Sequence, residues 1–129
     1  MDQIDILSGL RPGAGLYEIR RERLNFVDGT ELCRKTVLAP QHGFDISHAM
    51  RAALAARMAR LIGHEALAKS YDVMLDAAGA DPRLQDIAAV TPLATAADRV
   101  TTALVRHADI VTSAPRMFVS WNSERSTVA

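Results

Sequence analysis

The chain has 129 residues, of which 49% are apolar, and its 15 basic side chains balance 15 acidic ones. This balance excludes the strongly basic surface by which proteins bind nucleic acid or an anionic membrane, and no apolar run approaches the roughly 20 residues of a membrane-spanning helix. A chain of this length most simply folds as one domain, and its alanine-rich composition, with 5% aromatics, favours helices.

The N-terminal segment predicts one short helical turn. Over residues 2–10 we expect Ile4, Ile6 and Leu7 to face inward. The segment is acidic and has no basic region before an apolar core, so we expect no secretory signal there.

A loop rich in Pro and Gly follows at residues 11–15 and leads into a short predicted helix at 16–24. The densest charge cluster of the chain, EIRRER at 18–23, lies in this helix. Because the cluster mixes both signs, it is typical of a solvated helix face rather than of an anion-binding site.

The next predicted helix covers residues 31–38, with Asp28 and Thr30 as alternative N-caps. It contains Cys33, the only cysteine of the chain, which excludes an intrachain disulfide and any CxxC pair. A lone cysteine fits a reducing compartment, so we expect a cytoplasmic location. We expect Cys33 to be a buried, inert thiol, because cysteine is among the most buried residue types; the alternative is a reactive thiol beside Arg34.

The strongest helical pattern spans residues 47–63 and ends at Gly63, a natural C-terminal cap. One arc of this helix carries large side chains and a second arc carries alanines, which allow a neighbouring helix to approach closely. The members are Met50, Leu54, Met58 and Leu61 on the first arc, and Ala49, Ala52, Ala56 and Ala59 on the second. The pattern predicts the central helix of a bundle.

The following segment, residues 65–78, is amphipathic and ends at Gly79. Its apolar face comprises Leu67, Tyr71, Met74, Leu75 and Ala78. A tight junction between two helices with buried faces predicts an antiparallel helical hairpin.

Two further helix starts each place proline after a polar cap, at Asp81-Pro82 and at Thr91-Pro92. The first predicts a short helix with Leu84 and Ile87 inward. The second predicts a long helix over 92–112, unless Thr95 and Asp98 form a capping box one turn later. The seam expected for the long helix consists of Leu93, Ala97, Val100, Leu104 and Val111.

No segment alternates with the period of a β-strand, so the fold class we predict is all-α. We expect a single helical domain over residues 1–116 and a C-terminal segment at 117–129 that ends in a flexible tail. The short apolar run at 116–121 could serve as a docking segment.

Three stretches resemble the carboxymuconolactone decarboxylase/alkylhydroperoxidase D-like family, in a branch that lacks the CxxC motif. They are IDILSGLRPGAGLYEIRRER at 4–23, RAALAARMARLIG at 51–63 and LVRHADIVTSAPR at 104–116. The likeness covers most of residues 2–116. It implies a helical bundle with a central antiparallel hairpin that usually forms homo-oligomers. Members of that branch continue with a further helical region, which we expect a second copy or a different subunit to supply here.

The active motif of that family is a glutamate in the core helix, a CxxC at the helix junction and a histidine one turn later. With Arg51 and Gly63 matching its framework, the cysteine positions fall on His64 and Leu67, the histidine on Tyr71 and the glutamate on Ala52. Peroxide reduction needs one thiol to attack and a second to resolve the sulfenic acid. The resemblance therefore implies a protein without dithiol peroxidase activity.

His64 and Tyr71 are the candidate pocket residues, since seven residues make about two helical turns. The alternatives are that His64 is a polar residue of the first turn and that Tyr71 is a core residue with one hydrogen-bond partner. His107 lies near the seam of the last helix, where we expect a hydrogen-bonded core histidine.

His42, His48 and Asp45 could contribute to a metal site, but HGFDISH has no established ligand spacing. We therefore expect no metal and no cofactor.

Three functions remain as hypotheses. The first is a non-redox structural or small-molecule-binding subunit of a homo-oligomer. The second is a cysteine-independent acid–base decarboxylase or lyase that acts through His64 and Tyr71 on a small acidic lactone-like substrate. The third is a helix-turn-helix DNA-binding module. The exposed face of helix 65–78 argues against it, because it is acidic whereas phosphate contacts need cations. We therefore expect no nucleic-acid and no membrane partner.

Overall fold

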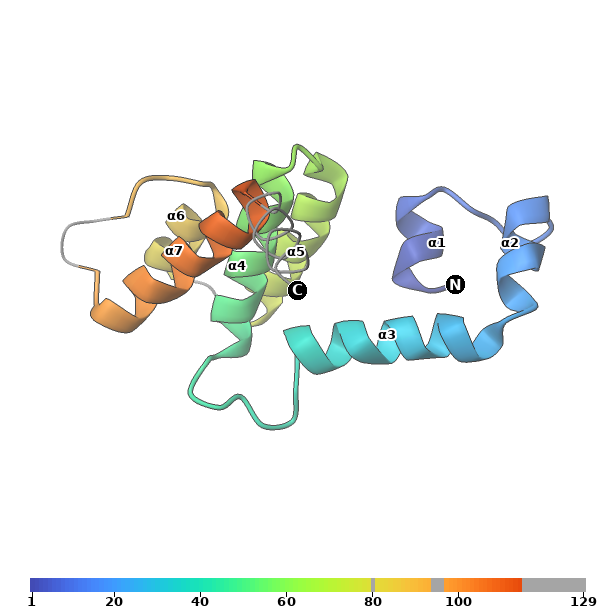
Figure 1. The fold of residues 1–129 in the computed structure, drawn as a ribbon, viewed down its shortest axis with the longest axis horizontal. Helices are drawn as coiled ribbons and strands as arrows, with labels where there is room; N and C mark the ends of the chain where they lie inside the picture. Colours follow the sequence, from blue (N-terminus) through green and yellow to red (C-terminus); the bar gives the residue numbers. More distant parts are fainter. Residues whose placement is uncertain (80, 94–96, 115–129) are drawn as a thin grey trace, which may run out of the picture.

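The computed structural model describes residues 1–79, 81–93 and 97–114, and within them the chain is all-α, as predicted (Figure 1). The helices are α1 (Gln3–Leu7), α2 (Gly15–Arg21), α3 (Leu24–Leu38), α4 (His48–Leu61), α5 (Glu65–Ala77), α6 (Pro82–Ala88) and α7 (Arg99–Ser113). No strand occurs in these three ranges. None of the helices described is both long and apolar enough to cross a membrane.

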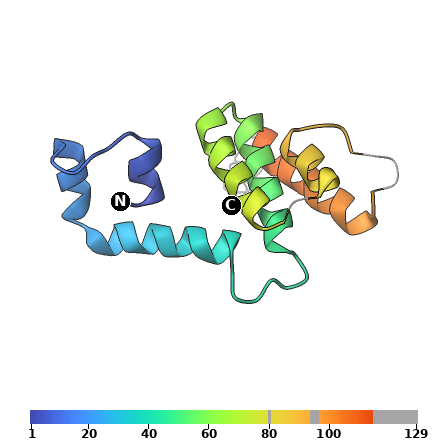
Figure 2. The same ribbon diagram turned by 180° about the vertical axis from the view of Figure 1, so that it is seen from behind.

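The predicted hairpin at the centre of the molecule is confirmed, with α4 and α5 packed side by side (Figures 1 and 2). The Ser47 hydroxyl caps α4 by accepting the amide proton of Met50 at 3.1 Å. Gly63 follows α4 with a φ of 78°, a left-handed conformation that glycine adopts without the strain of a side chain. The chain therefore reverses within three residues, and α5 returns along α4.

The core of the molecule lies where α6 and α7 pack on this hairpin. Its buried residues are Ala49, Ala52, Ala53, Ala56, Leu75, Ile87, Ala88 and Val105. The alanine arc of α4 is therefore the buried one, which lets the neighbouring helices approach closely. The large-residue arc is half-buried at Met50 and Leu54, which pack against this core, and Leu61 at its end is exposed.

The last helix begins later than predicted, at Arg99 rather than Pro92. The Asp98 carboxylate caps it by accepting the amide proton of Thr101 at 2.7 Å, which fixes the start about two turns beyond the proline. The predicted seam was also out of phase: Val100 is 66% exposed, and Val105 is buried against α4 instead. The buried face of α7 is rotated about the helix axis by about one residue from the predicted seam, because contact with α4 decides which side of α7 is covered.

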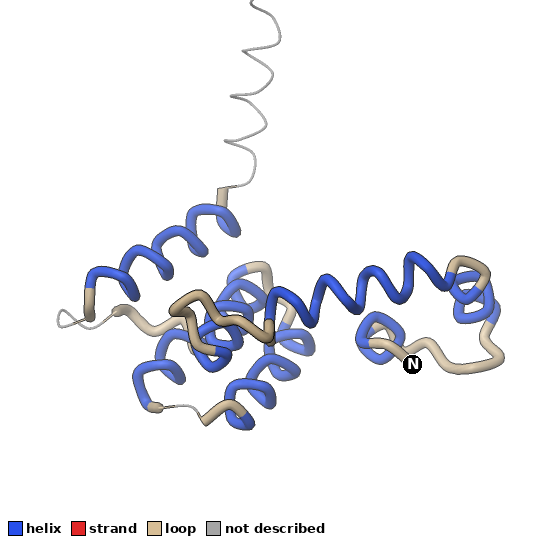
Figure 3. The backbone as a smooth tube through the Cα atoms, turned by 90° about the horizontal axis from the view of Figure 1, so that it is seen from below, coloured by secondary structure: helices blue, strands red, loops and turns tan. Residues whose placement is uncertain are grey.

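The N-terminal helices form an arm that stands away from the bundle (Figures 1 and 3). We use "arm" for α1–α3 and "bundle" for α4–α7. The arm supplies no residue to the core cluster among the described residues. Only the C-terminal end of α3 adjoins the bundle, while α2 lies at the opposite end of α3.

Two N-terminal predictions were wrong. Ile4 and Ile6 are 40% and 56% exposed, whereas Asp5 between them is fully buried, because arginines of α2 pair with it. The predicted helix at 31–38 begins at Leu24, so that neither Asp28 nor Thr30 is a cap. The packing of Val27 and other inward residues outweighs the cost of about 1 kcal/mol of keeping a glycine inside a helix.

Three predictions concern residues outside those described: the docking segment at 116–121, the tail that follows it, and the capping box that would include Thr95. The single domain over 1–116 stays a prediction.

Candidate functional site

The α4–α5 junction places His64 at the N-cap of α5, where its Nδ1 accepts the amide proton of Leu67 at 3.2 Å. His64 is exposed and caps α5, which agrees with the alternative that it is a polar residue at the start of the helix. Tyr71 lies two turns further on, half-buried against the core cluster. No hydrogen bond joins the two side chains among the described contacts, and neither lines the two cavities described below. Their convergence in one pocket stays a hypothesis.

Arg51, which matches the family framework, has a structural role in the loop between α3 and α4. Its guanidinium donates to the carbonyl oxygens of Val37 and Gly43, each at 2.9 Å, and its Nε donates to that of Ile46 at 3.3 Å. One planar cation thus satisfies three backbone acceptors, which fixes the entry of α4.

Arg57 is the buried cation of the bundle, only 7% exposed. It forms a two-pronged ion pair with Asp109 of α7, with distances of 2.6 Å from Nε and 2.9 Å from Nη2. Its remaining nitrogen donates to the carbonyl oxygen of Ile87 at 3.3 Å. The aspartate belongs to the HADIVT stretch of the family resemblance, and here it ties α7 to α4.

Arg60 links α4 to α5 and α6 near the junction. It pairs with Asp72, with a distance of 3.0 Å from Nη1, and donates to the carbonyl oxygen of Ala88 at 2.9 Å. The hydrogen bond to Asp72 raises the pKa of the Arg60 guanidinium above its usual value. Arg60 is therefore already paired within the protein rather than free to bind an anionic substrate beside the junction.

The three residues considered for metal binding do not converge. His48 donates or accepts through Nε2 at the Pro40 carbonyl oxygen, at 2.8 Å, and the His42 ring lies 6.0 Å from that of Phe44. Asp45 is exposed. No group of three or more metal-ligating side chains occurs in the part of the chain that the structure describes.

Two expectations of burial were wrong. Cys33 is exposed on α3, because its position on the helix is turned away from α1. His107 is exposed on α7, since the buried face of that helix passes through its neighbour Ala108 instead.

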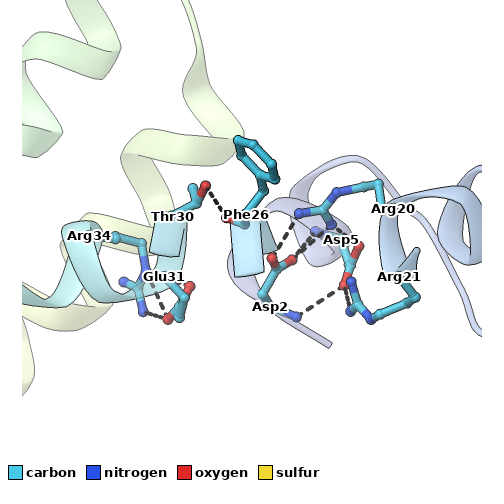
Figure 4. Close-up of polar contacts among 8 residues, drawn as sticks. All are labelled: Asp2, Asp5, Arg20, Arg21, Phe26, Thr30, Glu31 and Arg34. Carbon is cyan, nitrogen blue, oxygen red and sulfur yellow. Dashed lines mark hydrogen bonds and ion pairs between the residues drawn. The ribbon is translucent and has the colours of Figure 1, made fainter. Parts of the chain in front are cut away.

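A cluster of four charges that sequence reasoning missed holds α1 to α2 (Figure 4). Asp2 and Asp5 form a reciprocal capping box, and Arg20 pairs with both aspartates, at 2.8 Å from Asp2. Arg21 pairs with Asp5 and lies over the Tyr17 ring at 4.3 Å. The hydrogen bond from Arg20 holds the pKa of Asp2 well below its usual range. We call this cluster the N-terminal clasp.

The EIRRER run that supplies the two arginines of the clasp is therefore more than a solvated face. The run alone gave no indication of its partners, because Asp2 and Asp5 lie 15 to 18 residues away in the sequence.

The described residues line at least two cavities. One, of about 440 Å³, lies between α4, α6 and the segment before α7. Two of its carboxylates, Asp81 and Asp98, already cap helices by accepting amide protons, at 3.0 and 2.7 Å. The other, of about 530 Å³, lies between α1 and α3 and is lined by both signs of charge. Neither arrangement singles out one class of ligand.

The arm exposes an unusual amount of apolar surface. Its large apolar side chains with more than half of their surface exposed are Ile6, Leu16, Ile19, Leu24, Phe26, Leu32 and Val37, with exposed fractions of 55% to 66%. Single exposed apolar residues are normal, but several on one face of a helix, as Phe26 and Val37 are on α3, favour contact with another molecule.

Comparisons of the chain with protein-family models, with curated proteins and with solved structures gave no match. The family resemblance thus rests on the residues quoted above.

Proposed function

We propose that the chain is a non-redox, CxxC-lacking member of the carboxymuconolactone decarboxylase/alkylhydroperoxidase D-like family. In this proposal it acts as a structural or small-molecule-binding subunit of a homo-oligomer. The observation that carries the proposal is the arm, which lies outside the core of the bundle and carries seven large apolar side chains that are more than half exposed. Burial of such exposed apolar side chains against another surface stabilises a protein, and large exposed apolar patches mark such contacts.

The helix junction supports the non-redox part of the proposal. A dithiol peroxidase needs two thiols at the junction, whereas His64 and Leu67 occupy the positions that the resemblance assigns to them. The only cysteine of the chain, Cys33, lies on the arm rather than at the junction. The residues of the resemblance that remain, Arg51 and Asp109, hold loops and helices together.

The proposal is tested by light scattering over a concentration series together with an assay of thiol-dependent peroxide consumption. We expect self-association and no turnover above the buffer rate. A chain that stays monomeric at high micromolar concentration, or one that consumes peroxide, would contradict the proposal.

The acid–base lyase remains the alternative hypothesis, and His64→Ala tests it with a small acidic lactone as substrate. Because His64 also caps α5, the variant should lose about 1 kcal/mol of unfolding free energy in any case. His64→Asn is the matched control, since asparagine caps helices but is no general base. If the lyase hypothesis is right, both variants lose turnover although the asparagine variant keeps its stability; unchanged turnover in both excludes it.

A further inference from the structure

We propose that α3 pairs with α3 of a second copy of this chain, in antiparallel orientation, through the half of the helix that faces away from α1. This inference rests on the proposed function, because it names the surface through which the oligomer forms. We define the outer face of α3 as Asn25, Phe26, Gly29, Thr30, Leu32, Cys33, Thr36 and Val37.

The charged side chains of α3 lie on the side of the helix that faces α1, and not on the side that faces away from α1. All four charged side chains of the helix, Asp28, Glu31, Arg34 and Lys35, line the cavity toward α1. Figure 4 shows Glu31 and Arg34 on the opposite side of the helix from Phe26 and Thr30. The solvent-exposed face of a helix ordinarily carries its charged side chains. The outer face carries none and is therefore suited to burial.

Two hydroxyl groups of the outer face have partners within α3 itself. The Thr30 hydroxyl donates to the carbonyl oxygen of Phe26, and the Thr36 hydroxyl to that of Leu32, each at 2.8 Å. Phe26, Leu32 and Val37 are 62% to 66% exposed. At the N-terminal end of this face the Arg23 guanidinium lies over the Phe26 ring, at 5.6 Å from its centroid. Along the rest of the face, burial removes apolar surface from water and leaves both hydroxyl donors with their partners.

The spacing of the outer face matches a second copy of itself. Phe26, Thr30, Cys33 and Val37 are four, three and four residues apart, the spacing of a seam between two paired helices. Because this order is the same in both directions, a two-fold axis near the middle of the seam places Phe26 opposite Val37 of the second copy. It likewise places Thr30 opposite Cys33. A surface without charges avoids the like-charge contacts that such symmetry would otherwise impose.

The position of the bundle favours the antiparallel orientation. The bundle adjoins the C-terminal end of α3, and α2 lies at the N-terminal end (Figures 1 and 2). In an antiparallel pair the two bundles lie at opposite ends of the helix pair. A parallel pair would bring both bundles to the same end, where they would compete for space.

Sedimentation velocity on the full chain, from low to high micromolar concentration, tests the interface with two matched variants. Val37→Asp places a carboxylate in the seam, whereas Val73→Asp makes the same change on α5, at a valine that is 69% exposed compared with 62% for Val37. We expect a dimer for the wild type and for Val73→Asp. Val37→Asp should raise the dissociation constant at least about tenfold, because its charge would be buried at the interface. Far-UV circular dichroism should be the same for all three chains.

The outcomes separate this inference from the proposed function. A wild-type oligomer that Val37→Asp and Val73→Asp weaken equally, or not at all, overturns the α3 interface and leaves the proposed function standing. A wild type that remains monomeric overturns both.

Cysteine cross-linking tests the orientation. Under mild oxidation with copper–phenanthroline, Thr30→Cys should give a covalent dimer, because the new thiol lies opposite Cys33 of the second copy. The wild type, with Cys33 opposite Thr30, should not. A covalent dimer that forms equally well in the wild type would place the two Cys33 side chains together and overturn the antiparallel arrangement.

Discussion

Arginine side chains provide most of the specific long-range contacts of this small protein. Arg51 satisfies one carbonyl oxygen of α3 and two of the loop that follows, Arg57 joins α4 to α7, and Arg60 joins α4 to both α5 and α6. A planar guanidinium with five donors suits each of these places, since a lysine ammonium is a compact point charge without separate nitrogens in a rigid fork. At the scale of single residues, these three cations therefore act on the fold itself.

The ion pair between Arg57 and Asp109 gives the first residue-scale prediction. Asp109→Ala should lower the unfolding free energy by about 3 kcal/mol, because it leaves a guanidinium that is 7% exposed without its carboxylate. Urea unfolding measures the change, and the double variant Arg57→Met, Asp109→Ala is the control. We expect the double variant to be more stable than Asp109→Ala alone, because it buries no unpaired charge. A loss below about 0.5 kcal/mol in Asp109→Ala would contradict a buried pair.

The pKa of Asp2 gives the second residue-scale prediction, which concerns the N-terminal clasp. The hydrogen bond from Arg20 lowers the pKa of Asp2 in the folded state relative to the unfolded chain. The resulting stabilisation is complete above the unfolded value of about 4 and is lost as the pH falls below it. NMR amide exchange should therefore show α1 opening in acid, at a pH where α4 is still protected.

Asp2→Asn is the control for the clasp, because an amide does not titrate. In this variant the opening of α1 should lose most of its dependence on pH below about 4. If wild-type α1 and α4 lost protection at the same pH, the clasp would not be a separately titrating unit.

Single elements could be predicted where the signals that define them are local. The α4–α5 hairpin follows from Ser47, Gly63 and the alanine spacing, all of which are visible in the sequence. The start of α3 and the phase of α7 could not be predicted in this way, because Val27 and Val105 owe their burial to neighbouring helices. The exposure of Cys33 was missed for the same reason.

The alanine arc of α4 gives a prediction at the scale of the element. Ala56→Leu should destabilise the protein by about 1–3 kcal/mol, because Ala56 has no exposed surface and three added carbons must displace a neighbouring helix. Leu54→Ala, on the half-buried arc, should cost about 2 kcal/mol, the low end for a leucine that leaves a core. Thermal or urea unfolding compares the two. A neutral Ala56→Leu would mean that α4 is not closely packed at its alanine face.

The whole molecule consists of a bundle with its own core and an arm that reaches away from it (Figure 3). Composition predicted the all-α class, but the separation of arm and bundle could not be predicted, because it depends on which apolar faces find partners within the chain. The candidate site was less predictable than the fold. Spacing alone placed His64 and Tyr71 two turns apart, yet only the structure shows that the histidine caps α5 and that Arg60 already pairs with nearby acids.

The central claim is that this chain works as a non-redox subunit of a homo-oligomer. Native mass spectrometry of the full chain, purified from its own host under gentle conditions, tests it most directly. One spectrum reports the number of copies, any foreign subunit and any retained small molecule. We expect an even-numbered homo-oligomer whose mass does not change when a reducing agent is added. A monomer at every concentration measured would contradict it.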